Sequence, residues 1–218
     1  MYLAQEILDT RYQIRDTASV RVLLLDNIDS FTWNLAQLIS QQGAECTVLS
    51  KDDCSFEKIM AYAPDRIVLS PGPGHPKDAH ASLSILRAIR DHALSVPVLG
   101  VCLGHQCMGL VFGSAAIITK ALEPMHGKTS LIHHTGVSIF HSIPSPFTVA
   151  RYHSLVVSSL PKNFELLAWT SGVQALSPSQ PQTIMAMRHT SLPLIGVQFH
   201  PESFMTEHGE TLMKNFLS

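Results

Sequence analysis

The chain has 218 residues, of which 15% are charged, and 15 Lys and Arg against 17 Asp and Glu give a net charge of -2. No block of Lys or Arg points to a nucleic-acid or membrane-surface partner, and no apolar run approaches the ~18 residues that span a bilayer. Charged residues make up roughly 25% of an average soluble domain, so their shortage predicts that a partner covers part of the surface.

The first twenty residues carry acidic side chains and no continuous apolar segment. This pattern argues against a signal or transit peptide and predicts a cytoplasmic protein. We interpret residues 1–20 as an N-terminal extension, either a disordered arm or a misassigned start. One domain is expected over residues 21–218, because no repeat or low-complexity linker divides them.

The cysteines, at positions 46, 54, 102 and 107, are too few and too irregularly spaced for a disulfide framework. They also lack the paired Cys-x-x-Cys spacing of zinc sites. The 12 histidines lie mostly in polar, loop-like stretches. We therefore expect no metal and no cofactor in this chain.

Short apolar runs alternate with helical patterns in the first half. Ser30 is expected to cap the first helix, and Gly43 and Gly113 to end the first and third. Strands that are apolar on both faces and alternate with helices predict a doubly wound, mostly parallel α/β sheet flanked by helices. The expected strands cover 21–26, 44–50, 65–70 and 96–101, and the expected helices 30–43, 82–93 and 103–113.

From about residue 115 to 190 the pattern changes to short alternating segments separated by Pro, Ser and Asn, which predicts an added antiparallel part. A buried strand and an amphipathic helix then follow. The alternating segments are 137–140, 147–157, 164–170 and 183–189, the buried strand is 192–199, and the helix is 206–218.

The stretch VPVLGVCLGHQ ends a buried strand on Cys102, between Gly100 and Gly104. Its Gly-x-Cys-x-Gly spacing is that of the Gly-x-Ser-x-Gly turn, in which a nucleophile lies on a sharp bend and larger side chains would collide. The alternative is that Cys102 is a small buried apolar residue, as most free cysteines are. This stretch alone leaves both interpretations open.

Two further segments end strands, and in an open α/β sheet such ends face one crevice. His200 and Glu202 would share one side of an extended backbone, so they could supply the base that a thiol needs and the group that orients it. Around Pro73, which has no N–H, Gly72 or Gly74 could donate a backbone N–H to an oxyanion. The alternatives are a surface strand end with chance polar residues and an ordinary turn.

Six motifs spread over the chain resemble the class I (triad) glutamine amidotransferases. They are LLDNIDSFTWNL, LSPGPG, GVCLGHQ, MHGKTS, RYHSLVV and VQFHPES. DNIDSFT, MHGKTS and RYHSL narrow the resemblance to the chorismate-aminating branch, the small subunits of anthranilate synthase and aminodeoxychorismate synthase. The resemblance leaves out only the first twenty residues, and it implies a flavodoxin-like fold.

The resemblance also implies residue roles. Cys102 would attack the side-chain amide of L-glutamine, form a γ-glutamyl thioester and release ammonia. His200 would act as general base and acid, with Glu202 orienting it. The backbone N–H groups of Gly72 and Leu103 would form the oxyanion hole.

Glutamine binding and the partner are implied in the same way. The partner would be a chorismate-binding large subunit, to which any magnesium requirement would belong. The residues that would hold the α-amino and carboxylate groups of glutamine and line its site are Gly72, Pro73, Gly74, Gln106, Ser154 and Leu155.

The chain departs from the family pattern at few positions. Ile28 and Trp33 stand where the family often has tyrosine, and we interpret both as ordinary packing substitutions. His126 and Lys128 lie in a stretch that the family uses near the subunit boundary, where a contact role and a solvated loop both remain open.

Two other classes of protein compete with an ammonia-supplying subunit. One is a free-standing cysteine hydrolase of γ-glutamyl substrates, and Gln106 with the RYHSL motif argues against it. The other is a non-catalytic binding module, which the intact set of Cys102, His200 and Glu202 argues against.

Overall fold

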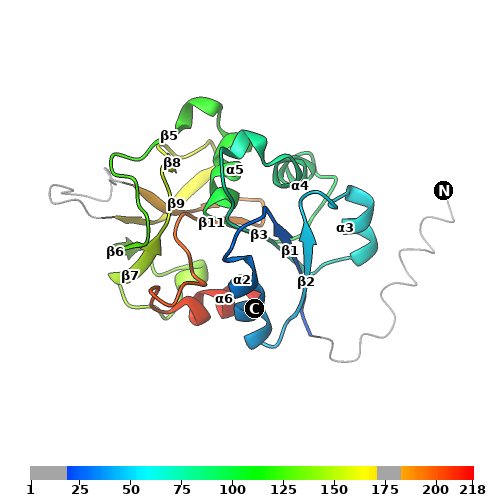
Figure 1. The fold of residues 1–218 in the computed structure, drawn as a ribbon, viewed down its shortest axis with the longest axis horizontal. Helices are drawn as coiled ribbons and strands as arrows, with labels where there is room; N and C mark the ends of the chain where they lie inside the picture. Colours follow the sequence, from blue (N-terminus) through cyan, green and yellow to red (C-terminus); the bar gives the residue numbers. More distant parts are fainter. Residues whose placement is uncertain (1–18, 171–182) are drawn as a thin grey trace.

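The computed structural model describes residues 19–170 and 183–218 (Figure 1). The expected N-terminal extension lies outside the described residues except for its last two, so its boundary stays a prediction. No helix in the described part of the chain is long and apolar enough to cross a membrane.

A nine-stranded sheet forms the centre of the described structure, in the order β2-β1-β3-β4-β11-β10-β9-β6-β7. The strands from β2 to β11 pair in parallel, and the remaining pairs are antiparallel. The strands are β1 (Arg21–Asp26), β2 (Glu45–Ser50), β3 (Arg66–Leu69), β4 (Val98–Val101), β6 (Lys128–His134), β7 (Phe147–Arg151), β9 (Phe164–Thr170), β10 (Ile184–His189) and β11 (Leu194–Val197).

Helices cover both faces of the sheet (Figure 1). α2 and α6 bury their apolar side chains in one core cluster, and α3, α4 and α5 bury theirs in another on the opposite face. The helices are α2 (Thr32–Gln41), α3 (Phe56–Tyr62), α4 (His80–Arg90), α5 (Leu103–Phe112) and α6 (Gly209–Leu217). The prediction of a doubly wound α/β fold with an added antiparallel segment is confirmed.

β4 and β11 are neighbours in the parallel part of the sheet, and their register sets the geometry of the site. Gly100 pairs with Gly196, and Val101 pairs with Val197. Cys102 therefore follows one strand directly, and His200 comes three residues after the end of the other.

The antiparallel part differs from the prediction in three ways. Residues 137–140 form no strand, because η3 (Ser138–Phe140) is a helical turn whose buried Ile139 and Phe140 join the same apolar cluster as α6. Residues 147–157 split into β7 and β8 (Leu155–Val157), and β8 forms a separate two-stranded sheet with β5 (Ile118–Lys120). The sequence analysis also missed β5 and β6 here, and it missed the short helix α3 in the parallel half. The described chain also has the turns η1 (Pro76–Asp78) and η2 (Ala115–Ile117).

The start of α2 also differs from the prediction. Ser30 does not cap the helix, which has Phe31 at its cap position and no side-chain cap. Instead, the Asp29 carboxylate accepts the Phe31 backbone N–H at 2.8 Å, which forms a local turn before the helix. The predicted end is confirmed, because Gly43 follows the helix with a φ of +82°.

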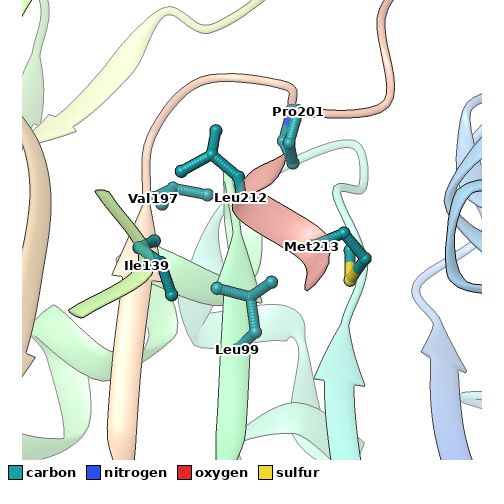
Figure 2. Close-up of a pocket in the computed structure, with 6 residues that line it drawn as sticks. All are labelled: Leu99, Ile139, Val197, Pro201, Leu212 and Met213. Carbon is teal, nitrogen blue, oxygen red and sulfur yellow. The ribbon is translucent and has the colours of Figure 1, made fainter. Parts of the chain in front are cut away.

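α6 packs against the segment that follows β11. Leu212 and Met213 pack over Leu99 and Val197 and leave a cavity of only about 10 Å³ (Figure 2). At the start of α6, a Cβ on Gly209 would lie 2.0 Å from the Pro201 carbonyl oxygen. The helix therefore fixes the backbone around Pro201.

Candidate active site

Cys102 lies on a strained bend between β4 and α5. Its φ of +51° and ψ of -95° are unfavourable for any residue with a side chain, and such strain gathers at functional sites. A Cβ on Gly100 would lie 2.6 Å from the Gly104 carbonyl carbon, and one on Gly104 would lie 2.6 Å from the Leu69 oxygen. The predicted crowding around the bend is therefore confirmed.

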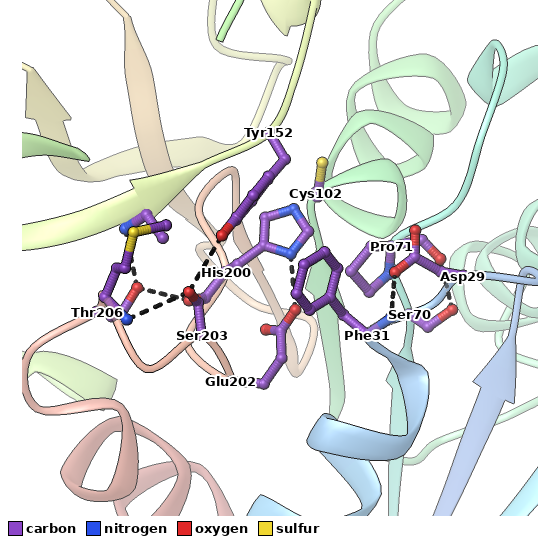
Figure 3. A network of polar contacts seen from close by, with 12 residues as sticks. Asp29, Phe31, Ser70, Pro71, Cys102, Tyr152, His200, Glu202, Ser203 and Thr206 are labelled. Atoms are coloured by element: carbon purple, nitrogen blue, oxygen red, sulfur yellow. Dashed lines mark hydrogen bonds and ion pairs between the residues drawn. The ribbon is translucent and has the colours of Figure 1, made fainter. Parts of the chain in front are cut away.

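His200 and Glu202 meet through a short hydrogen bond, with 2.6 Å between His200 Nδ1 and Glu202 Oε1. Figure 3 shows the imidazole between the Glu202 carboxylate and the Cys102 side chain. The expected extended backbone is wrong, because the Ser203 N–H donates to the His200 carbonyl at 3.3 Å and closes a turn. The Thr206 hydroxyl also donates to that carbonyl, at 2.6 Å, and braces the turn.

The electrostatics of the site favour a charged imidazole. Burial lowers the pKa of His200, but the interactions with Cys102 and Glu202 outweigh it and raise the pKa above the ordinary value. Within the described chain, His200 Nε2 and Glu202 Oε2 have no hydrogen-bond partner. The ring nitrogen beside the thiol is thus free to exchange a proton with it or with a bound molecule.

Two aromatic side chains that the sequence analysis did not single out hold the imidazole. Tyr152 packs against the edge of the His200 ring at 4.9 Å between centroids, and Phe31 packs against it at 5.5 Å. The two aromatic rings lie 4.9 Å apart. Both residues occur in quoted motifs, but an isolated aromatic residue carries no signal that separates this role from core packing.

The structure brings Gly72 and Leu103 together beside Cys102. A Cβ on Gly72 would lie 2.7 Å from Leu103 Cδ2 and 2.7 Å from Asn27 Cβ, so only glycine fits. Within the described chain, neither the Gly72 N–H nor the Leu103 N–H donates a hydrogen bond. Free N–H groups beside a nucleophile suit a developing oxyanion.

A buried polar network, which the sequence analysis missed, anchors this loop. The Asn27 side-chain amide donates to the Ser70 carbonyl at 2.9 Å, and the Ser70 hydroxyl accepts the Asn27 backbone N–H at 2.9 Å. The Ser82 hydroxyl of α4 donates to Asn27 Oδ1 at 3.0 Å. The ends of β1 and β3 are therefore tied together immediately before Gly72.

The residues expected to bind glutamine come from three segments of the described chain: the loop after β3, α5, and the start of β8 with the residue before it. Gln106 is buried and donates to the Leu155 carbonyl at 2.9 Å, which joins α5 to the start of β8. Ser154 is exposed, as are Pro73 and Gly74, and Gly74 has a φ of +84°.

The motif near the expected subunit boundary lies on the surface. His126 and Lys128 are exposed, and Lys128 begins β6. The adjacent Met125 N–H donates to the His153 carbonyl at 2.9 Å, so this segment runs beside the RYHSL motif. Nothing in the described structure tests whether these two side chains contact a partner, and that role stays a prediction.

Ile28 and Trp33 are not packing residues, contrary to the sequence-based interpretation. Their side chains are 53% and 68% exposed, and Ile28 has a φ of +65°, which a β-branched residue rarely adopts. The apolar character of both residues, read without their surroundings, suggested a core position that the fold does not give them.

The donor set defines the chemistry available. Within the described ranges, no group of three His, Cys, Asp or Glu side chains is arranged to hold a metal ion. A thiol beside an imidazole, a carboxylate behind the imidazole and two free N–H groups form the constellation of acyl transfer through a covalent intermediate.

Comparisons with known proteins agree on a family. Residues 23–218 match the family described as glutamine amidotransferase class-I. The chain is 47% identical to anthranilate synthase component 2 of Pseudomonas aeruginosa, over 90% of this chain and 94% of that protein. It is 46% identical to aminodeoxychorismate synthase component 2 of Escherichia coli, over 90% of this chain and 98% of that protein. A solved glutamine amidotransferase from Thermotoga maritima shares the fold, with a TM-score of 0.64 at 16% identity over 84% of this chain and 76% of that chain.

Proposed function

The chain belongs to the class-I glutamine amidotransferase family, and we propose that it is the glutaminase subunit that supplies ammonia to a chorismate-aminating synthase. The observation that carries the proposal is Cys102 on its strained bend, beside the hydrogen-bonded pair of His200 and Glu202. The names of both relatives, at 47% and 46% identity, support a second component as partner. The proposal covers the chemistry that the two synthases share.

The first half-reaction breaks the side-chain amide bond of L-glutamine. The Cys102 thiolate attacks the amide carbon, and the N–H groups of Gly72 and Leu103 stabilise the oxyanion. His200 gives its proton from Nε2 to the leaving nitrogen, and ammonia departs from a γ-glutamyl thioester. The raised pKa of His200 suits this step, because the proton-carrying form is the one required.

The second half-reaction consumes one water. Neutral His200 takes a proton from the water, which attacks the thioester carbonyl and releases glutamate and the Cys102 thiolate. Glu202 holds the imidazole through Nδ1 in both steps and compensates its positive charge. Water and glutamine therefore yield glutamate and ammonia, with the thiol regenerated.

Two exposed aromatic side chains near a groove beside the site support a partner subunit. A groove of about 610 Å³ lies between α2 and the segment 201–211, and Asn34, Glu202 and Phe204 line it. Phe204 is 96% exposed, and Trp33, next to Asn34 on α2, is 68% exposed. Large exposed aromatic side chains are enriched in protein interfaces. We propose that the large subunit covers this surface.

The test uses the chain together with the synthase subunit that co-purifies with it. Cys102→Ala should abolish glutamine-dependent amination of chorismate and leave amination by ammonium salt unchanged, because added ammonia bypasses this subunit. Glutamine-dependent turnover in the variant would contradict the role of Cys102. If the isolated wild-type chain released glutamate as fast as the complex with chorismate, the free-standing hydrolase would be the better assignment.

A further inference from the structure

A buried amide lies directly against the candidate nucleophile. The Gln198 side chain is fully buried, and its Nε2 donates to Cys102 Sγ at 3.6 Å, within the range of hydrogen bonds to sulfur. Gln198 follows β11 directly, two residues before His200. The thiol therefore has the imidazole and the amide of one segment as neighbours.

The orientation of the Gln198 amide is set by a second amide. Gln106 Nε2 donates to Gln198 Oε1 at 3.3 Å and to the Leu155 carbonyl at 2.9 Å. A backbone carbonyl can only accept, so it holds the nitrogen of Gln106 toward itself. The remaining N–H of Gln106 then faces Gln198 Oε1, which leaves the Gln198 N–H group toward the sulfur.

A buried histidine and arginine extend the chain of hydrogen bonds beyond the Leu155 carbonyl. The Arg151 guanidinium, which can only donate, gives its Nε–H to His153 Nε2 at 3.1 Å. His153 must then carry its proton on Nδ1, which lies 3.1 Å from the Leu155 carbonyl. Burial, followed by Arg151, lowers the pKa of His153 to about 3, so the ring stays neutral.

We propose that Gln198 is a positioning residue of the glutaminase reaction, and that the Leu155 carbonyl, acting through Gln106, aims its N–H group at Cys102 Sγ to stabilise the thiolate. Each link allows one direction of donation, so a donor and not an acceptor faces the sulfur. Hydrogen bonding to the charged form of a group favours that form. The proposal rests on the proposed function, in which the Cys102 thiolate is the nucleophile.

Other titratable and charged groups lie on the elements packed around the site. His200 and Glu202 face it from the segment after β11. His105 lies on α5, fully buried, and burial lowers its pKa to about 4. His153 and Arg151 lie behind Gln106 on the remaining side. Because these groups are unchanged in variants of Gln198, a change in the rate at which Cys102 is alkylated reports the amide.

The experiment measures the thiolate without glutamine turnover. The full chain is alkylated with iodoacetamide from pH 5 to 9, and modification of Cys102 is followed by mass spectrometry. Gln198→Met keeps the length of the side chain and removes the donor. It should slow alkylation of Cys102 at pH 6 roughly tenfold. Gln198→Glu, which places a carboxylate near the sulfur, should slow it further.

Two more variants complete the design. Asn215→Leu removes a side-chain amide that donates to the Ile139 and His141 carbonyls on the α6 side of the sheet, and it should keep the wild-type alkylation profile. Gln106→Glu cannot donate to the Leu155 carbonyl or to Gln198 and should shift the profile in the direction of Gln198→Met.

Each result decides the proposal. A wild-type profile in both Gln198 variants would overturn it, and a wild-type profile in Gln106→Glu would overturn the orientation by Gln106. Thermal unfolding checks that every variant is folded, and Gln198→Glu serves if Gln198→Met is not. Because iodoacetamide needs no glutamine site, a shifted profile in a chain that does not hydrolyse glutamine even in complex with the synthase subunit would refute the proposed function and leave intact the role of Gln198 in stabilising the thiolate.

Discussion

Replacing Gly100 by alanine should damage the bend that carries Cys102. The new Cβ would lie 2.6 Å from the Gly104 carbonyl carbon and 2.8 Å from the His105 nitrogen. An ordinary carbon contact is ~3.5 Å, so β4 and the start of α5 must separate by about 0.9 Å. A displacement of about 1 Å at a reacting group costs roughly a hundredfold in rate, and forced overpacking costs about 1–3 kcal/mol of unfolding free energy.

The assay compares kcat/KM for glutamate release with the urea midpoint of the same protein. Gly43→Ala is the matched control, because Gly43 has a positive φ but a Cβ at that position would meet nothing within 4 Å. It should cost about 1 kcal/mol of unfolding free energy without affecting turnover. Ammonium-dependent amination by the complex should survive in both variants. If Gly100→Ala kept wild-type kcat/KM, the bend would tolerate a side chain and the crowding argument would be refuted.

Two further predictions concern stability. Leu212 is buried and lines the small cavity between α6 and the sheet. Leu212→Ala enlarges that cavity, so it should lower the unfolding free energy by about 3 kcal/mol and Tm by roughly 6–12 °C, measured by calorimetry. The unfolding free energy should also fall as the pH drops from about 6.5, because burial lowers the pKa of His105 to about 4 and that of His153 to about 3, and the unfolded chain binds protons first. Urea titrations from pH 7 to 4 that gave a constant midpoint would contradict this.

The parts of the site that could be predicted from sequence are those fixed by neighbours in the chain. The bend at Cys102 needs small residues two positions to either side, so Gly100 and Gly104 indicate it. The His200–Glu202 pair spans two residues, although a turn and not an extended strand brings the side chains together. Steric limits between near neighbours and short spacings in the chain are visible in a single sequence, so these features could be predicted.

Contacts between distant segments could not be predicted in this way. Tyr152 and Phe31 reach His200 from segments about 120 residues apart, and Asn27 reaches Ser70 across the sheet. Aromatic and small polar residues occur in many environments. Only the order of the strands in the sheet decides which residues become their neighbours. The same limit explains the errors at 137–140 and at Ile28 and Trp33, where apolar character was known but the covering element was not.

The register of β4 and β11 has a consequence for redesign. Cys102 and His200 follow adjacent parallel strands, so their separation depends on the ~4.8 Å strand spacing. It also depends on the antiparallel part, because the His200 backbone N–H donates to the Ala150 carbonyl of β7 at 3.1 Å. Tyr152, which directly follows β7, and the Leu155 carbonyl at the start of β8 also reach the site. A different antiparallel half could therefore be grafted onto the cysteine-histidine pair to change the molecule that is bound only if it kept the backbone of β7 at Ala150, which binds both His200 and Thr206.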